Sequence, residues 1–154
     1  ILACAALSAE LICDGQHVHP GAVRALLKAK GAGGLILVSD GTPLLGLGEG
    51  TYRDLQGRVI RASDGACRTP DGSLVGGATP LDRCLINFCR ATGSSLGEAA
   101  RTVTLNPANL LGLGDRKGSL EPGKDADIAV VDQDSEIRMT FVRGRLCYSR
   151  QPPG

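Results

Sequence analysis

The chain has 154 residues, 42% of them hydrophobic, and a formal net charge of +1. This length and hydrophobic content allow one domain-sized core and argue against a disordered chain. Because the charge is almost neutral and the aromatic residues number only two Tyr and two Phe, the sequence lacks the basic face and stacking platform of a nucleic-acid-binding protein. A small neutral or anionic metabolite remains open as a partner.

Six cysteines are scattered along the chain without a CxxC pair or a dense framework. We interpret them as reduced thiols that fill the core, in preference to disulfides or zinc ligands, which predicts a cytoplasmic compartment. The opening segment ILACAAL is too short to cross a bilayer and no basic region precedes it, so we expect no membrane association. This segment instead resembles a strand or helix that has been cut open.

The first forty residues predict a strand, a helix and a second strand. Residues 9–13 form a short apolar run, and apolar positions at helical spacing after Pro20 predict a helix over residues 20–30. Residues 34–40 follow as an unbroken apolar run, which favours a parallel strand covered on both faces. The order predicts a βαβ unit.

Short segments separated by Asp-Gly turns predict β-hairpins over residues 51–75. Thr79 is the predicted N-cap of an amphipathic helix, Ser95 with Glu98 predicts a capping box for another, and Asn106 is the predicted start of a third.

The tail returns to strand periodicity. Residues 127–132 predict one strand, and residues 136–149 predict a hairpin with its turn near Gly144. Residues 151–154 are expected to be a frayed end.

Asp40 follows the apolar run Leu35–Val38 after one serine, and its position has two interpretations. Asp before Gly is common in turns, so Asp40 can simply open a turn with Gly41. In parallel α/β folds, however, acids at the carboxyl ends of strands line the active site. Spacing alone leaves both readings open.

His17 and His19 are the only histidines in the chain and lie two residues apart. On a strand both rings could reach one metal, but a third ligand would have to come from Asp14, Asp40 or a cysteine, none at a recognisable spacing. We therefore favour a single histidine that contacts substrate. The glycines of residues 46–50 keep neither dinucleotide nor P-loop spacing and indicate a flexible loop.

A long stretch near the end carries the most specific signal: TLNPANLLGLGDRKGSLEPGKDADIAVVD, residues 104–132, resembles the closing signature of the amidohydrolase superfamily. Within that superfamily three further segments, in the same order, resemble the N-acetylglucosamine-6-phosphate deacetylase family. They are ICDGQHVHP (12–20), LILVSDGT (35–42) and DGSLVGGATPLD (71–82).

The resemblance implies an α/β fold built on a (β/α)₈ TIM-like barrel with a small β-sandwich. Residues 1–120 would form the C-terminal part of the barrel, namely its last two strands and the following helices, with the β excursion 51–75. Residues 121–150 would form part of the sandwich. The family's metal ligands, a glutamate and two histidines on earlier strands, have no counterpart here.

The activity implied is hydrolysis of N-acetylglucosamine 6-phosphate to glucosamine 6-phosphate and acetate by metal-activated water. A divalent metal (Zn, Fe, Mn or similar), held by residues outside this chain, would lower the pKa of the water toward ~7. Asp40 matches the family's catalytic aspartate, which accepts the proton of the water and delivers it to the departing amine.

The resemblance also implies two substrate-binding loops. They consist of Asp14, Gly15, Gln16 and His17, and of Leu74, Val75 and Gly76. His17 would make the most direct contact with the sugar phosphate. The family usually carries a serine or two after the glycine of the second loop, whereas Gly77 and Ala78 follow here.

Two barrel strands alone would leave unpaired edges, so we expect the chain to associate with the N-terminal portion of the same enzyme. The resemblance further implies a homodimer, and the isolated chain is predicted to be inactive. Two alternatives stay open. One is another amidohydrolase of the dihydroorotase or nucleobase deaminase type, and the other is an inactive fragment that acts as a binding module.

Overall fold

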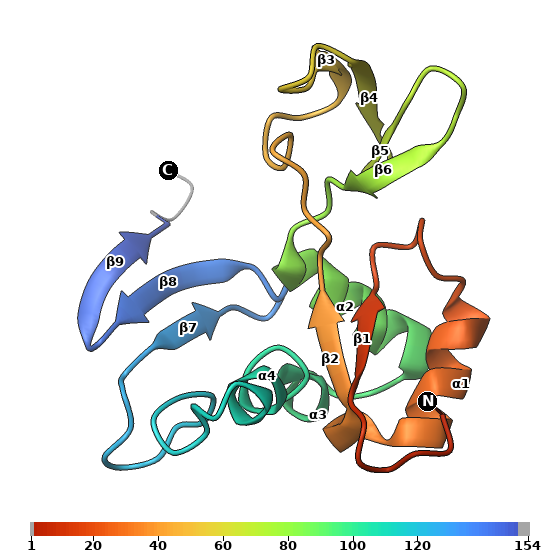
Figure 1. The fold of residues 1–154 in the computed structure, drawn as a ribbon. Helices are drawn as coiled ribbons and strands as arrows, with labels where there is room; N and C mark the ends of the chain where they lie inside the picture. Colours follow the sequence, from red (N-terminus) through yellow and green to blue (C-terminus); the bar gives the residue numbers. More distant parts are fainter. Residues whose placement is uncertain (1, 151–154) are drawn as a thin grey trace. The chain divides into compact units, whose positions relative to one another are not determined.

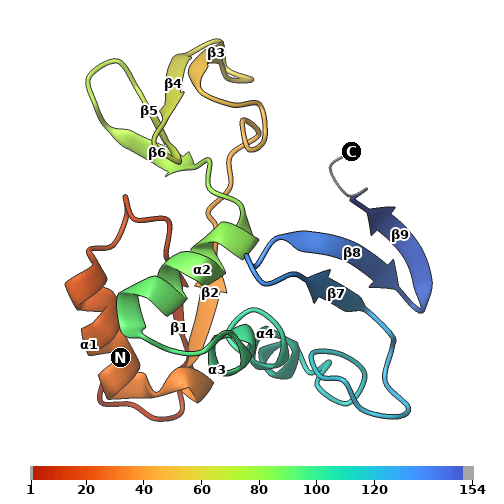
Figure 2. The same ribbon diagram turned by 180° about the vertical axis from the view of Figure 1, so that it is seen from behind.

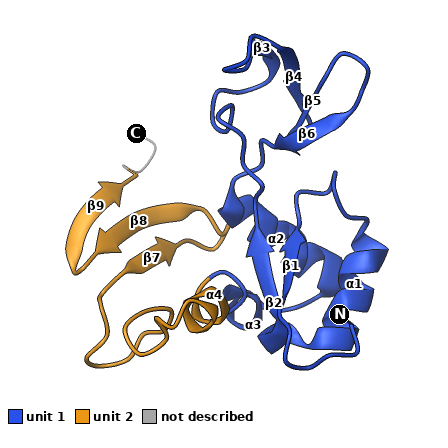
Figure 3. Ribbon diagram, in the orientation of Figure 1, with its two compact units in different colours: residues 1–103 blue, residues 104–154 orange. Residues whose placement is uncertain are grey.

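The computed structural model describes residues 2–150 and divides the chain into two compact units, with the division between Val103 and Thr104 (Figure 3). Both helices and strands occur in the first unit, and a small helix and an antiparallel sheet occur in the second. The class is therefore α/β, as predicted. The finer assignment of residues 1–120 to a barrel and 121–150 to a sandwich stays a prediction.

The first unit begins with the predicted βαβ unit (Figure 1). Strands β1 (Ala9–Ile12) and β2 (Leu35–Val38) pair in parallel, from Ala9 opposite Leu35 to Ile12 opposite Val38. Helix α1 (Pro20–Lys30) and a 3₁₀ turn (Ala32–Gly34) connect them. Both strands thus end at the same edge, which brings the loops that follow them together.

A hydrophobic core lies between these strands and the helices that cover one face of them, and in Figure 2 helix α2 (Leu81–Thr92) lies in front of β2. Helix α2 packs against both α1 and β2, and α3 (Leu96–Ala100) packs against α2. Phe88 of α2 is fully buried in a cluster with the alternate strand residues Leu11, Leu35 and Leu37. The core fixes the strands whose ends carry the predicted site.

The predicted β excursion is a four-stranded antiparallel sheet in the order β3-β4-β5-β6. Its strands are β3 (Gly50–Arg53), β4 (Val59–Ser63), β5 (Ala66–Arg68) and β6 (Leu74–Gly77). The excursion leaves and rejoins the chain at a parallel bridge between Gly41 and Gly77. The backbone N–H of Thr42 donates to the Gly77 carbonyl over 2.9 Å at this point.

The predicted helix starts are confirmed for α1 and α3 and corrected for α2. Ser95 and Glu98 form the predicted capping box at the start of α3. Thr79 does not cap α2, because its hydroxyl donates to the Gly65 carbonyl over 3.0 Å, and Pro80 takes the N-cap position instead. The Thr79 hydroxyl thus binds a residue distant in sequence and not a backbone N–H group in the first turn of α2.

The second unit contains α4 (Leu105–Leu110) and an antiparallel sheet of β7 (Ile128–Val131), β8 (Ile137–Val142) and β9 (Arg145–Ser149). Helix α4 begins one residue before the predicted Asn106, with Thr104 at the N-cap. The β8–β9 turn contains Gly144, as predicted. The expected frayed end, 151–154, lies outside the described residues.

Charged residues of the 104–132 segment pair with one another. Arg116 contacts Asp125 at 3.0 Å, and Lys117 forms ion pairs with Asp125 and Asp127. Hydrogen bonds from Lys117 to Asp127 and Asp125 raise the pKa of its ammonium group. These pairs join the two ends of the connection between α4 and β7. They therefore help to fix the conformation of that connection.

All six cysteines carry free thiols. Burial raises the pKa of the Cys13 and Cys84 thiols to about 11, so both stay protonated and serve as small apolar side chains. Within residues 2–150, none of the helices has the length and apolar character needed to cross a membrane.

Candidate active site

The loops after β1 and β2 carry the two acids of the predicted site. Asp14 lies two residues beyond Ile12, and Asp40 lies two residues beyond Val38, which pairs with Ile12. The ends of parallel strands are the usual position of active sites in α/β folds. The fold thus brings Asp40 to the same edge of the sheet as the first predicted substrate loop.

Asp14 is bound on both carboxylate oxygens within its own loop. Its Oδ1 accepts from the backbone N–H groups of Gln16 and His17, each over 2.9 Å, and its Oδ2 lies 2.6 Å from His17 Nδ1. The Asp14 side chain is fully buried. Burial raises the pKa of this carboxyl, but the hydrogen bonds from His17 and Gln16 outweigh it, so the net pKa is lowered and Asp14 is ionised.

His17 lies between the two acids. With Nδ1 bound to Asp14, its Nε2 faces Asp40, whose Oδ2 lies 3.5 Å away. The Asp40 side chain is 54% exposed, whereas that of Asp14 is inaccessible. Of the two acids, only Asp40 is therefore open to a molecule arriving from solvent.

His19 has a different task, so the two histidines do not act as a pair. Its Nδ1 accepts from the backbone N–H of Gly21 over 3.0 Å, which makes His19 the N-cap of α1. Among residues 2–150, no group of three or more His, Cys, Asp or Glu side chains could hold a metal ion. The side chains present therefore do not fit a metal centre of their own.

Strand β6 closes against Asp40 through two adjacent glycines. The N–H of Gly77 donates to the Asp40 carbonyl over 2.8 Å. A Cβ on Gly77 would lie 2.3 Å from the Ser39 carbonyl oxygen, and one on Gly76, where φ is +138°, would lie 2.7 Å from Thr42. Asp40 itself adopts φ 47°, a left-handed conformation that Asp tolerates. Because Gly76 and Gly77 have no side chains, strand β6 can pack directly against the backbone of residues 39–42.

Replacing Gly77 by Ala should disturb the Asp40 segment, because the new methyl group would collide with backbone that cannot move independently. We expect a loss of about 1–3 kcal/mol in the free energy of unfolding, measured by urea denaturation. Gly97→Ala in α3 is the matched control, since a Cβ there meets nothing within 4 Å. Equal stability of the two variants would contradict the close approach.

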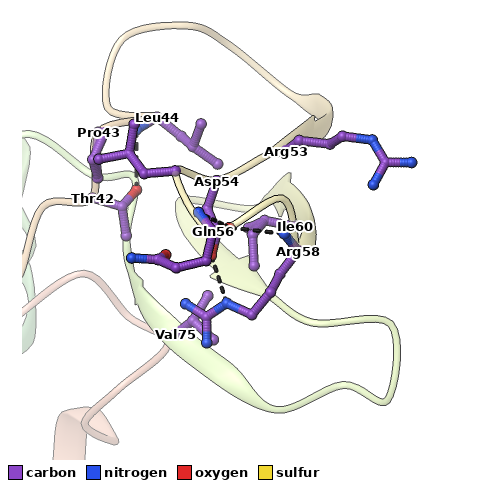
Figure 4. Close-up of a pocket in the computed structure, with 10 residues that line it drawn as sticks. Thr42, Pro43, Leu44, Arg53, Asp54, Gln56, Arg58, Ile60 and Val75 are labelled. Carbon is purple, nitrogen blue, oxygen red and sulfur yellow. Dashed lines mark hydrogen bonds and ion pairs between the residues drawn. The ribbon is translucent and has the colours of Figure 1, made fainter.

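Two residues of the second predicted loop lie beside different features of the structure. Gly76 lies beside Asp40, whereas Val75 lines a separate cavity of about 270 Å³ (Figure 4). The lining of this cavity includes Thr42, Leu44 and Ile60. Its Arg58 is already paired with Asp54 at 2.6 Å. The cavity contains no histidine, so the better candidate site is the one around Asp40.

One residue near the site was missed by sequence reasoning. Arg68 of β5 donates from its guanidinium to the Gln16 side chain over 3.4 Å and to the Gly72 carbonyl over 3.2 Å. Arg68 and Gln16 are 52 residues apart and belong to no common motif, so no local signal could have paired them. The contact links the excursion to the first predicted substrate loop.

The amidohydrolase family profile matches residues 17–147, so the chain belongs to the amidohydrolase family. The N-acetylglucosamine-6-phosphate deacetylase of Bos taurus is 39% identical over 90% of this chain and 34% of its own length. The N-acetylgalactosamine-6-phosphate deacetylase of Escherichia coli O157:H7 is 33% identical over 89% and 36%.

Solved structures agree with this assignment. The crystal structure of N-acetylglucosamine-6-phosphate deacetylase from Thermotoga maritima superposes with a TM-score of 0.88 at 34% identity, over 97% of this chain and 40% of that one. The chain therefore spans about a third of the length of the bovine and Escherichia coli relatives and two fifths of this structure.

Proposed function

We propose that this chain forms part of the active site of an N-acetylglucosamine-6-phosphate deacetylase. The observation that carries the proposal is the arrangement of Asp14, His17 and Asp40 where two parallel strands end. The names and identities of the relatives support a deacetylase of an amino sugar phosphate. They favour it over the dihydroorotase or nucleobase deaminase alternative.

In this proposal Asp40 is the proton carrier. Its exposed carboxylate accepts a proton from the attacking water and returns it to the nitrogen of the amine as the C–N bond breaks. His17, held by Asp14, offers Nε2 to an oxygen of the sugar phosphate. Gly76 lets strand β6 lie directly against Thr42 and the Asp40 backbone, where a side chain would collide, and so helps to hold Asp40 in place.

Members of the amidohydrolase family generally use a divalent metal to activate water. The described residues offer no set of ligands for one, so we propose that residues outside this chain hold it. Its identity among Zn, Fe, Mn and similar ions is left to metal analysis of the active enzyme. A homodimer is likewise part of the proposal.

The proposed function is tested by acetate release from N-acetylglucosamine 6-phosphate and N-acetylgalactosamine 6-phosphate, and by ring opening of dihydroorotate to N-carbamoylaspartate. We expect the first substrate to be turned over fastest when the chain is assembled with the N-terminal portion of the enzyme. The chain alone, supplied with metal, should release no acetate above background. Preference for dihydroorotate would refute the deacetylase, and activity of the lone chain would refute the need for outside ligands.

His17→Ala should raise KM in the active enzyme by a few-fold to about tenfold, because a neutral hydrogen bond contributes about 0.5–1.5 kcal/mol. The measurement is steady-state acetate release over a range of substrate concentrations. His19→Asn is the control, since Asn keeps the N-cap of α1 and His19 does not face Asp40. An unchanged KM would exclude His17 from substrate binding.

A further inference from the structure

We propose that Asp14 is a positioning residue, which holds the His17 imidazole with its hydrogen on Nδ1 and so reserves Nε2 for the substrate. The part of this inference that concerns substrate rests on the proposed function. The part that concerns the ring does not, because it follows from contacts within residues 14–17.

Asp14 has no accessible side-chain atom with which to contact a substrate directly. Two backbone N–H groups occupy its Oδ1, the His17 ring occupies its Oδ2, and its side chain has no exposed surface. Its influence on a bound molecule must therefore pass through His17. The loop geometry that buries Asp14 is the geometry that orients the ring.

The contact with Asp14 selects one form of the imidazole. A carboxylate is only an acceptor, so at 2.6 Å the facing Nδ1 must carry a hydrogen whether the ring is neutral or charged. A neutral ring then has its lone pair on Nε2. The opposite tautomer would set a lone pair against an ionised oxygen.

Nε2 and Asp40 Oδ2 lie 3.5 Å apart, which is longer than a good hydrogen bond. An oxygen placed beside the pair can lie within hydrogen-bonding distance of both atoms. With the ring neutral, Nε2 accepts a hydrogen bond, so a hydroxyl group or water is the matching ligand at this position. Asp14 thereby determines what the exposed side of His17 can recognise.

His19 supplies an internal contrast. Its Nδ1 accepts a hydrogen bond from Gly21, so its neutral ring must carry the hydrogen on Nε2. The chain contains only these two histidines. The inference thus requires opposite tautomers at two positions of one chain.

Asp14→Asn is the sharpest variant. The Asn carbonyl can keep both backbone hydrogen bonds made by Oδ1, which places the amide nitrogen where Oδ2 was. That nitrogen is a donor, so it requires a lone pair on His17 Nδ1 and moves the ring hydrogen to Nε2. The variant keeps the loop and reverses the tautomer.

The test uses this chain assembled with the N-terminal portion of the enzyme, with ¹⁵N only in the histidine rings of this chain, at a pH where both rings are neutral. Long-range ¹H–¹⁵N correlation spectra, assigned with His19→Asn, should show hydrogen on Nδ1 in His17 and on Nε2 in His19. Asp14→Asn should move the His17 hydrogen to Nε2 and leave His19 unchanged. An Nε2–H form of His17 in the unmodified chain, or no change in Asp14→Asn, would overturn the proposal.

A second measurement separates positioning from general structural damage. In the active enzyme Asp14→Asn should lower kcat/KM, and the double variant with His17→Ala should lose no more than His17→Ala alone. Additive losses would refute action through His17. If the spectra are as expected but no variant or unmodified assembly releases acetate, the proposed function fails and the positioning of the ring stands.

Discussion

Asp40→Asn should lower kcat for acetate release by about 10²–10⁴ in the active enzyme, which is the usual contribution of a general acid–base group. KM should change little, because the amide keeps the size of the side chain and removes only its ability to accept a proton. The backbone should also be retained, since Asn tolerates the left-handed conformation that Asp40 adopts at φ 47°.

A matched control is available for this prediction. Asp64 also precedes a glycine, is exposed and has φ 53°, but it lies in the β4–β5 turn, where its N–H donates to the Glu49 carboxylate over 3.0 Å. Asp64→Asn should therefore leave both kcat and KM unchanged. If Asp40→Asn retains more than a tenth of the original kcat, Asp40 is only a turn residue and the hydrolytic assignment is wrong.

Phe88→Ala should reduce the free energy of unfolding by about 3–5 kcal/mol, as expected for a large aromatic removed from a packed core. Phe88 is 0% exposed and lies in the cluster that holds β1 and β2. Its loss would leave a cavity behind the strands whose ends carry Asp14 and Asp40. The total stability of a domain is about 5–15 kcal/mol, so the effect is a large share of it.

Urea denaturation of the assembled enzyme measures this change. Leu81→Ala, in the same helix, is the comparison because Leu81 is 38% exposed and should cost much less. If Phe88→Ala and Leu81→Ala destabilise equally, the core is not centred on Phe88. Residual activity below the unfolding transition should also fall, since the two strand ends would no longer be held in register.

The parts of the fold that could be predicted are those with a local cause. Helix α1 has the predicted bounds because Pro20 and the apolar spacing both lie within it. The Ser95–Glu98 capping box was predicted for the same reason. Thr79 failed as an N-cap because its hydroxyl binds Gly65, a partner that the local pattern does not contain.

The contacts of the candidate site likewise include local ones that a sequence can predict and long-range ones that it cannot. The contact of His17 with Asp14 spans three residues, so a motif of this kind lies within reach of sequence reasoning. The approach of Gly77 to Asp40 depends on the return of an entire four-stranded sheet, and no periodicity indicates it. The roles of Asp40 and of the two loops came from resemblance, and they stay predictions until variants are measured.

The bridge between Gly41 and Gly77 has a consequence for evolution and engineering. Because the excursion departs and returns at one point, its hairpin tips can gain or lose residues without changing the distance between its two ends. The tip between β3 and β4 is therefore a suitable place to graft a tag or a reporter, whereas a length change beside Gly41 or Gly77 would shift the acid itself.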